Sequence, residues 1–305
     1  MHVERPELPA KPRLRPSRRS ALIAGATGLG IAAFTVGTAT GSLPLSAVQR
    51  ALGVTSPAPA TQPGVAKIER VWSAYRNREV ELLTLLPRRS PAPNLPITLL
   101  LHGLHGRARS APPTGTLAEL SSQVARRAIP PYGLVAVDGG DDYWHEDHPG
   151  DDPMAMLLEE VPQWLRQRGL GGAAGLPLAC MGMSMGGFGA LLYARRRAER
   201  RQPVQALALL APALITSWDE MSRRDAFHSA ADWASMDPLR HLGAIQGVPT
   251  AVWCGTEDPF ISGVRKFIAD THPVLAYTAR GRHGDSFNRT VVPAFVRFLG
   301  RHITS

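Results

Sequence analysis

The chain has 305 residues, of which 44% are hydrophobic and 19% charged, a composition typical of a globular protein with one large α/β domain or two small ones. Its net charge of +9 is uneven, because the first 40 residues hold six lysines and arginines against two glutamates. The remaining surplus is spread thinly and forms no basic stripe with interleaved aromatic residues, which argues against a nucleic-acid partner.

Residues 1–40 have the organisation of a targeting signal. The basic stretch 11–20 (KPRLRPSRRS) ends in Arg18-Arg19, and the weakly apolar residues 21–39 follow it. This order resembles a twin-arginine export signal, so we expect the export machinery as a partner and a secreted or cell-envelope product. Cleavage after Ala39 or after Ala60 would leave no stable membrane span. An uncleaved anchor is the alternative, because such an apolar segment can just cross a bilayer.

Residues 25–30 (GATGLG) look like a dinucleotide-binding glycine loop, but the context of that motif is missing. The preceding decapeptide is polar and contains two prolines, and no acidic residue occurs between Glu7 and Glu69. We therefore expect no cofactor. Residues 41–65 are rich in Pro, Ala, Ser and Thr and are expected to form a linker. The catalytic domain would then be residues 66–305.

In that domain, short apolar runs alternate with helical patterns. Segments 67–75 and 79–86 predict an opening hairpin. The fully apolar runs predict a parallel sheet covered on both faces, in one doubly wound α/β domain. Cys180 and Cys254 lie in these runs, so we expect small buried side chains instead of a disulfide or a metal site. The predicted strands are 97–101, 134–137, 178–183, 206–210, 250–254 and 274–278, and the predicted helices are about 116–128, 153–168, 187–200, 262–270 and 289–300.

One serine stands between closely spaced glycines. Residues 182–186 (GMSMG) form a G-x-S-x-G motif after a predicted strand and before a predicted helix, which is the context of a nucleophile elbow. Small residues two positions to either side of Ser184 would let the strand and helix approach. The helix would then direct its N-terminal N–H groups at the site where negative charge develops. Ser184 is therefore the candidate nucleophile.

A serine nucleophile needs a base and an orienting carboxylate. His283 follows the predicted strand 274–278, and both Glu257 and Asp258 follow the predicted strand 250–254. All three would lie at the carboxyl ends of strands, where ligands bind in open α/β sheets. Asp258 is the preferred acid, with Glu257 as its rival.

An oxyanion hole needs two backbone N–H groups. The first would come from Met185, directly after the nucleophile, and the second from Leu104 in the glycine-containing loop after strand 97–101. The histidines of that loop, His102 and His105, are expected to be structural.

The segment 138–152 (DGGDDYWHEDHPGDD) is a second conspicuous loop. Its carboxylates, with His145 and His148, invite a metal hypothesis. We favour a solvated loop at the mouth of the active site, and expect no metal.

Several segments together resemble one family: LLHGLHG (100–106), VDGGDDYWH (137–145), MGMSMGGFGALLYA (181–194), CGTEDPF (254–260) and GRHGDSF (281–287). They are similar to the putative-esterase branch of the α/β-hydrolases, which includes S-formylglutathione hydrolases (esterase D) and secreted mycolyltransferases. The resemblance spans residues 67–302 and implies an α/β-hydrolase fold, with a mostly parallel central sheet and helices on both faces. It also implies Ser184, Asp258 and His283 as the triad, with the N–H groups of Leu104 and Met185 as the hole.

The same resemblance suggests where a substrate would lie. The stretch 224–239 is similar to the segment that borders the acyl pocket in such esterases, so Phe227 and Trp233 are candidate pocket residues, and Trp144 is a candidate on the opposite rim. There are two departures. The export signal does not fit the cytosolic formylglutathione branch, and mycolyltransferases tend to use Glu as the acid.

These patterns lead to an expected function. The chain would be an exported serine esterase that hydrolyses small-molecule or lipid esters of short to medium acyl chains through an acyl-enzyme. The alternatives are an acyltransferase to a sugar or lipid alcohol, and a non-catalytic cell-envelope protein that retains this fold.

Overall fold

The structure of the protein is a computed structural model, and it describes residues 64–146 and 148–303. The expected export signal (1–40) and all but the last two residues of the expected linker (41–65) lie outside the described residues. The first described strand starts at Val65, one residue before the expected start of the catalytic domain at residue 66.

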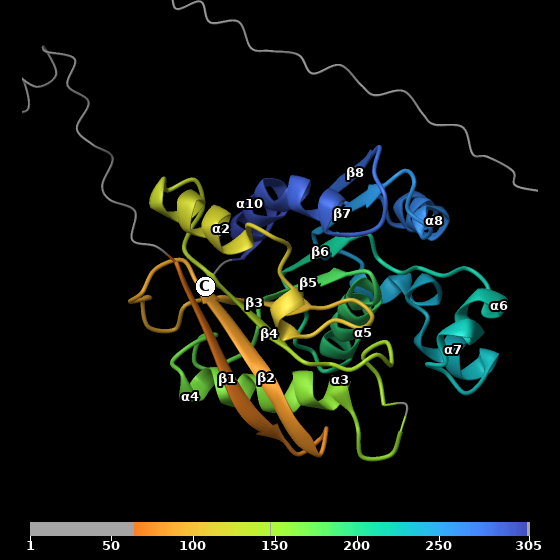
Figure 1. Ribbon diagram of the computed structural model, residues 1–305, viewed down its shortest axis with the longest axis horizontal. Coiled ribbons are helices and arrows are strands. Elements are labelled where there is room, and N and C mark those ends of the chain that lie inside the picture. The colour runs from red at the N-terminus through yellow and green to blue at the C-terminus, as the bar shows by residue number, and fades with distance from the viewer. Residues whose placement is uncertain (1–63, 147, 304–305) are drawn as a thin grey trace, which may run out of the picture. The chain divides into compact units, whose positions relative to one another are not determined.

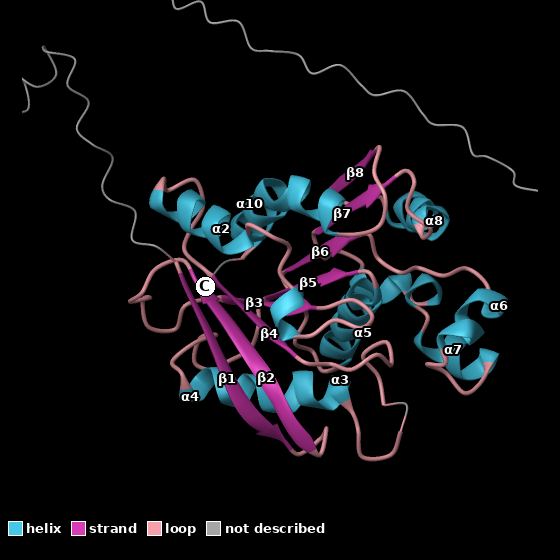
Figure 2. Ribbon diagram, viewed as in Figure 1, coloured by secondary structure: helices cyan, strands magenta, loops and turns pink. Residues whose placement is uncertain are grey.

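The described chain folds around an eight-stranded sheet in the order β1-β2-β4-β3-β5-β6-β7-β8 (Figure 2). The opening hairpin β1–β2 is antiparallel, and β2 also pairs antiparallel with β4. From β4 to β8 all neighbours are parallel, so their carboxyl ends share one edge of the sheet. The strands are β1 Val65–Ser73, β2 Arg78–Leu86, β3 Ile97–Leu101, β4 Gly133–Val137, β5 Ala179–Met183, β6 Ala206–Leu210, β7 Thr250–Gly255 and β8 Leu275–Ala279.

Helices cover both faces of the sheet (Figure 1). One core packs α2 and α10 against one face, and the other packs α4, α5 and α8 against the opposite face. Side chains alternate between these cores along each strand, because successive residues of a strand point to opposite faces. In β6, for example, Leu209 joins one core and Leu210 the other. The α-helices are α2 Thr116–Ala125, α3 Pro153–Ala155, α4 Val161–Gln167, α5 Met185–Glu199, α6 Trp218–Met221, α7 Ala230–Met236, α8 Ile261–Thr271, α9 Asp285–Asn288 and α10 Val292–His302.

The sequence predicted this architecture. The hairpin and the six further strands are confirmed within one or two residues, and so is the mostly parallel sheet with helices on both faces. The predicted helix 153–168 is interrupted by a π-helical turn at Met156–Glu160. The short helices α6 and α7 were not expected. Figure 1 shows them beside the main layers, in the long connection between β6 and β7.

Candidate active site

Ser184 occupies the sharp turn between β5 and α5. Its backbone φ of 57° and ψ of −122° lie outside the regions that serine ordinarily adopts, so the surrounding packing must hold a strained turn. Serine often caps a helix at this position, but the Ser184 side chain makes no capping hydrogen bond. Its hydroxyl is therefore directed toward other partners.

Glycines on both sides of Ser184 let α5 approach both β5 and β3 closely. A Cβ on Gly182 would overlap the carbonyl oxygen of Gly186, and a Cβ on Gly186 would overlap that of Leu101. Both obstacles are backbone atoms, which cannot move aside as a flexible side chain can. The strand, strained turn and helix are the geometry that the G-x-S-x-G motif predicted.

The side chains of Ser184, His283 and Asp258 form a continuous hydrogen-bonded chain. His283 Nε2 lies 2.9 Å from Ser184 Oγ, and His283 Nδ1 lies 2.6 Å from Asp258 Oδ2. Because an ionised carboxylate can only accept, we assign the ring proton to Nδ1, which leaves Nε2 to accept from the serine hydroxyl. The three residues follow β5, β7 and β8 at the shared edge of the sheet.

The two candidate acids have different partners. The Asp258 side chain is completely buried, and its Oδ1 accepts a hydrogen bond of 2.9 Å from the Phe260 N–H, which fixes the carboxylate while Oδ2 faces His283. Glu257 is exposed and pairs with Arg280 at 2.9 Å and with Arg282 at 3.5 Å. The structure thus brings Asp258, and not Glu257, to the histidine.

The loop after β3 lies directly against the nucleophile. A Cβ on Gly103 would come within 3.1 Å of Ser184 Cβ, closer than most side-chain contacts, and within 3.6 Å of Ser184 Oγ. Leu104 is the next residue of this loop, and Met185 is the first residue of α5. Of the two residues expected to supply the oxyanion hole, Leu104 directly follows Gly103 in the chain, and Met185 directly follows Ser184.

His102 holds this loop in place. It is fully buried, its Nδ1 donates to the Gly103 carbonyl at 2.8 Å, and its Nε2 accepts from the Gly139 N–H at 2.9 Å. Burial lowers the pKa of His102, which keeps the ring neutral, as these two bonds require. His102 thereby ties the loop after β3 to the loop after β4, the structural role that the sequence suggested. Exposed His105 pairs with Asp141 at 3.2 Å.

Aromatic side chains form an apolar wall against the first turn of α5, the helix that follows the nucleophile. Phe188 lies in the first turn of α5, and the Tyr143 ring meets it edge-on at 5.2 Å between centroids. Phe227 packs 5.9 Å from both rings and is 8% exposed. The structure therefore places Phe227, one of the three expected substrate-binding residues, in this wall.

The other two expected substrate-binding residues lie differently. Trp144 has no exposed surface, and its indole N–H donates to the His102 carbonyl at 3.3 Å. It joins the loops after β3 and β4 and leaves no surface for a substrate to touch, which corrects the expectation from the sequence. Trp233 is 3% exposed and stacks on half-exposed Trp218 at 6.2 Å.

The polar residues of the loop 138–152 are engaged in holding it. Asp138 accepts from the backbone N–H groups of Glu81 and Ala108, and Asp151 pairs with buried Arg76. His145 meets the carbonyl of Ala226 at 2.7 Å and so joins this loop to the segment that carries Phe227. In residues 64–146 and 148–303, no cluster of three or more His, Cys, Asp or Glu side chains could hold a metal ion.

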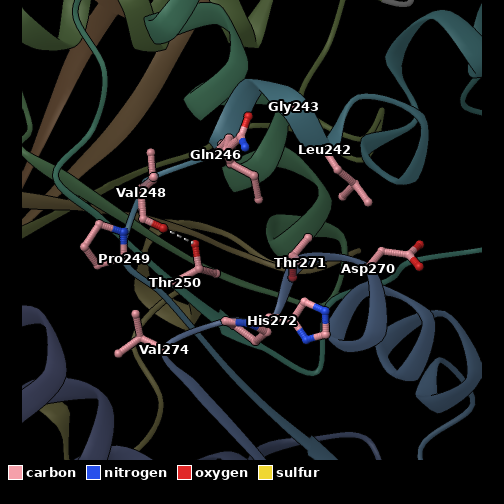
Figure 3. A pocket seen from close by; sticks show the side chains of 13 residues that line it. Leu242, Gly243, Gln246, Val248, Pro249, Thr250, Asp270, Thr271, His272 and Val274 are labelled. Atoms are coloured by element: carbon pink, nitrogen blue, oxygen red, sulfur yellow. Dashed lines mark hydrogen bonds between the residues drawn. The ribbon is translucent and has the colours of Figure 1, made fainter.

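A separate cavity of about 570 Å³ lies at the opposite edge of the sheet (Figure 3). Its lining comes from the segment that leads into β7 and from the turn before β8, including Thr250, which donates to the Val248 carbonyl, and His272. Asp258 and His283 of the candidate triad follow the other ends of these two strands, so this cavity is not part of the active site.

Sequence reasoning missed Phe260 as a residue of the site. Its ring meets the His283 ring edge-on at 5.2 Å and lies under the guanidinium of Arg224 at 5.6 Å. Nothing in the local sequence distinguishes it from an ordinary core phenylalanine, because these contacts join three loops that are distant in the chain.

The sequence of the chain matches a known protein family over most of the described domain. The family model described as "Putative esterase" matches residues 73–265. No curated protein matches the chain.

Solved structures share the fold at low sequence identity. A ferulic acid esterase superposes with a TM-score of 0.64 at 15% identity and covers 79% of this chain and 100% of its own. An S-formylglutathione hydrolase from Agrobacterium tumefaciens gives a TM-score of 0.61 at 16% identity, covering 79% of this chain and 96% of its own. MPT51 (FbpC1) of Mycobacterium tuberculosis gives 0.56 at 15% identity, covering 79% and 99%. At these identities the likeness concerns the fold alone.

Proposed function

Given that the chain belongs to the Putative esterase family of the α/β-hydrolases, we propose that it hydrolyses carboxylic esters with Ser184 as nucleophile, His283 as base and Asp258 as acid. The observation that carries this proposal is the continuous chain of hydrogen bonds from Asp258 through His283 to Ser184. Family membership supports the reaction class, and the hydrogen bonds support the roles of the residues.

The geometry accounts for each step of the first half-reaction. His283 Nε2 takes the proton of Ser184 Oγ as the oxygen attacks the ester carbonyl carbon. The C–O bond to the alcohol then breaks, and the same Nε2 returns the proton to the departing alkoxide. The Asp258 carboxylate holds the ring in the required tautomer and stabilises the imidazolium that forms.

The oxyanion of the tetrahedral intermediate would be held by the N–H groups of Leu104 and Met185. The contact of Gly103 with Ser184 supports this placement, as does the position of Met185 at the N-terminus of α5, where the helix dipole favours negative charge. Phe227 of the aromatic wall and Trp233, which stacks on Trp218, would border the acyl chain. The second half-reaction repeats these steps with water as the nucleophile and releases the acid.

We expect the preferred acyl chains to be short to medium in length. The rings of Tyr143, Phe188 and Phe227 pack against one another and would leave little room for a long chain between them. No long apolar run of sequence lies in the segment 224–239 that would border a deep lipid tunnel. An acyltransferase remains the second candidate, since hydrolysis and transfer share the first half-reaction and differ only in the acceptor.

We expect water to be the main acceptor. A transferase must bind an alcohol well enough to compete with bulk water, which requires a dedicated acceptor surface near His283. The measurement is product analysis of a short p-nitrophenyl ester with and without millimolar trehalose or glycerol. Free acid should be the main product under both conditions. Acylated sugar or glycerol in excess of free acid would show a transferase.

We also propose that the protein is exported by the twin-arginine route. The support is the sequence of residues 11–39, which lie outside the described residues. In the part that the structure describes, no helix has the length and apolar character to cross a membrane.

Replacing Arg18 and Arg19 together by lysine should retain the precursor inside the cell, because the paired guanidinium groups are what the export receptor reads. Immunoblots of the cell and the medium measure this, with an Arg13→Lys, Arg15→Lys double variant as the matched control that keeps the pair. Undiminished export of the Arg18/Arg19 variant would contradict the assigned route.

A further inference from the structure

Arg224 and the candidate catalytic histidine contact the same aromatic ring, that of Phe260. It ends a short 3₁₀ helix, Ser222–Arg224, that follows α6. Its guanidinium carbon is 5.6 Å from the centroid of the Phe260 ring, and that ring contacts His283 edge-on. A cation over an aromatic face is held there by the ring quadrupole. The Phe260 ring therefore holds the positive charge of Arg224 one side chain away from His283.

Arg224 makes only a loose ion pair within the part of the chain that the structure describes. The nearest carboxylate oxygen, Oε1 of Glu220, is 3.8 Å away, beyond hydrogen-bond distance, and no hydrogen-bond acceptor is found for Arg224 among the described residues. Neighbouring arginines differ in this respect. Arg223 donates to Asp219 at 2.6 Å, and Arg280 donates to Glu257 at 2.9 Å.

The charge of Arg224 also acts on Tyr143, one ring of the aromatic wall. Burial raises the pKa of Tyr143 to about 12, Arg224 acts in the opposite direction, and Glu220 adds to the increase. Both charges are therefore felt at a ring that packs against Phe188, close to Ser184 in the chain. The Arg224 side chain is 30% exposed, so solvent and small ligands can reach it.

We propose that Arg224 is an anion-binding, specificity-determining residue, and that the preferred esters of this protein carry a carboxylate; this inference rests on the proposed esterase function. A guanidinium offers five N–H donors in a plane and matches a carboxylate through two parallel hydrogen bonds. Resting on Phe260, it is oriented before the substrate arrives. The carboxylate could belong to the acyl half or to the alcohol half of the ester.

Two matched pairs of substrates separate these sources. For the alcohol half, 4-acetoxybenzoate is compared with its neutral methyl ester, methyl 4-acetoxybenzoate. For the acyl half, monomethyl adipate is compared with dimethyl adipate. The measured quantity is the ratio of kcat/KM for the anionic ester to kcat/KM for the neutral ester, at pH 7.5 and low salt, from initial rates.

Arg224→Gln should lower this ratio by about tenfold or more for at least one pair, because charge-assisted hydrogen bonds are the strong ones. The pair that responds identifies the half that carries the anion. Arg224→Lys should recover part of the ratio, since lysine keeps the charge but loses the planar fork. Added salt should lower the wild-type ratio, because exposed charges are screened.

Arg223→Gln is the matched control. It removes the same charge one residue earlier, from a side chain that is 71% exposed and paired with Asp219, and should leave both ratios unchanged.

The outcomes distinguish this inference from the proposed function. Hydrolysis of the neutral esters with both ratios unchanged in Arg224→Gln overturns the role of Arg224 and leaves the esterase standing. An equal fall in Arg223→Gln also overturns it, because a general field would then be responsible. If the wild-type protein hydrolyses none of the four esters and does not hydrolyse p-nitrophenyl acetate, the proposed function is overturned and this inference with it.

Discussion

Replacing Ser184 with alanine is expected to lower kcat by roughly 10⁴–10⁶-fold, since only substrate binding and the oxyanion hole would remain. The hydroxyl that would be lost lies 2.9 Å from His283 Nε2 and has no second role as a helix cap. The fold should therefore survive. Steady-state hydrolysis of a short p-nitrophenyl ester measures the effect, and circular dichroism checks the fold.

His283→Asn should cost about as much as Ser184→Ala, because the two side chains act as one unit. His272→Asn is the matched control: His272 is exposed, lies at the opposite edge of the sheet, and has a left-handed backbone that asparagine tolerates. A fluorophosphonate probe, which reacts only with an activated serine, should label the wild type and the His272 variant. If His283→Asn keeps more than a tenth of the activity, the base is another residue. Lack of labelling of the wild type would favour a non-catalytic protein.

Asp258→Asn should lower kcat by roughly 10⁴-fold, whereas Glu257→Gln should change it by less than about threefold. The Asp258 carboxylate holds the proton on His283 Nδ1, and an amide there would favour the wrong tautomer. The Glu257 carboxylate pairs with the exposed arginines Arg280 and Arg282, and surface ion pairs of this kind contribute little. The measurement is kcat of both variants with the same ester.

Glu257→Gln is itself the matched control, because it makes the same carboxylate-to-amide change one residue away. The opposite ranking would transfer the role of acid to Glu257. Similar small effects in both variants would mean that His283 is oriented by another group.

The local pattern of the sequence was sufficient for much of the site. The strand before Ser184 is fully apolar, the glycines at 182 and 186 mark a close approach, and a helix follows. Each of these features depends on neighbours within a few residues, so the sequence states it directly. The order of acid and histidine after the last two strands could also be read, because the ends of parallel strands meet at one edge.

Contacts between distant loops could not be read in this way. The choice between Glu257 and Asp258 depends on the direction of two adjacent side chains in a turn, which was fixed by the Phe260 N–H and by where the His283 loop lies. Trp144 was misplaced for a related reason. A tryptophan in a loop near the site can face a ligand or fill the space over a glycine, and here it packs over Gly139 and Gly189.

By itself, the sequence determined the alternation of strands and helices, the elbow at Ser184 and the set of candidate partners, because hydrophobic periodicity and glycine spacing are properties of neighbouring residues. Only the tertiary structure decided that Asp258 meets His283, that His102 joins two loops, and that Arg224 and His283 both contact Phe260. Those contacts join segments far apart in the chain, and they exist because the sheet gathers the loops at one edge.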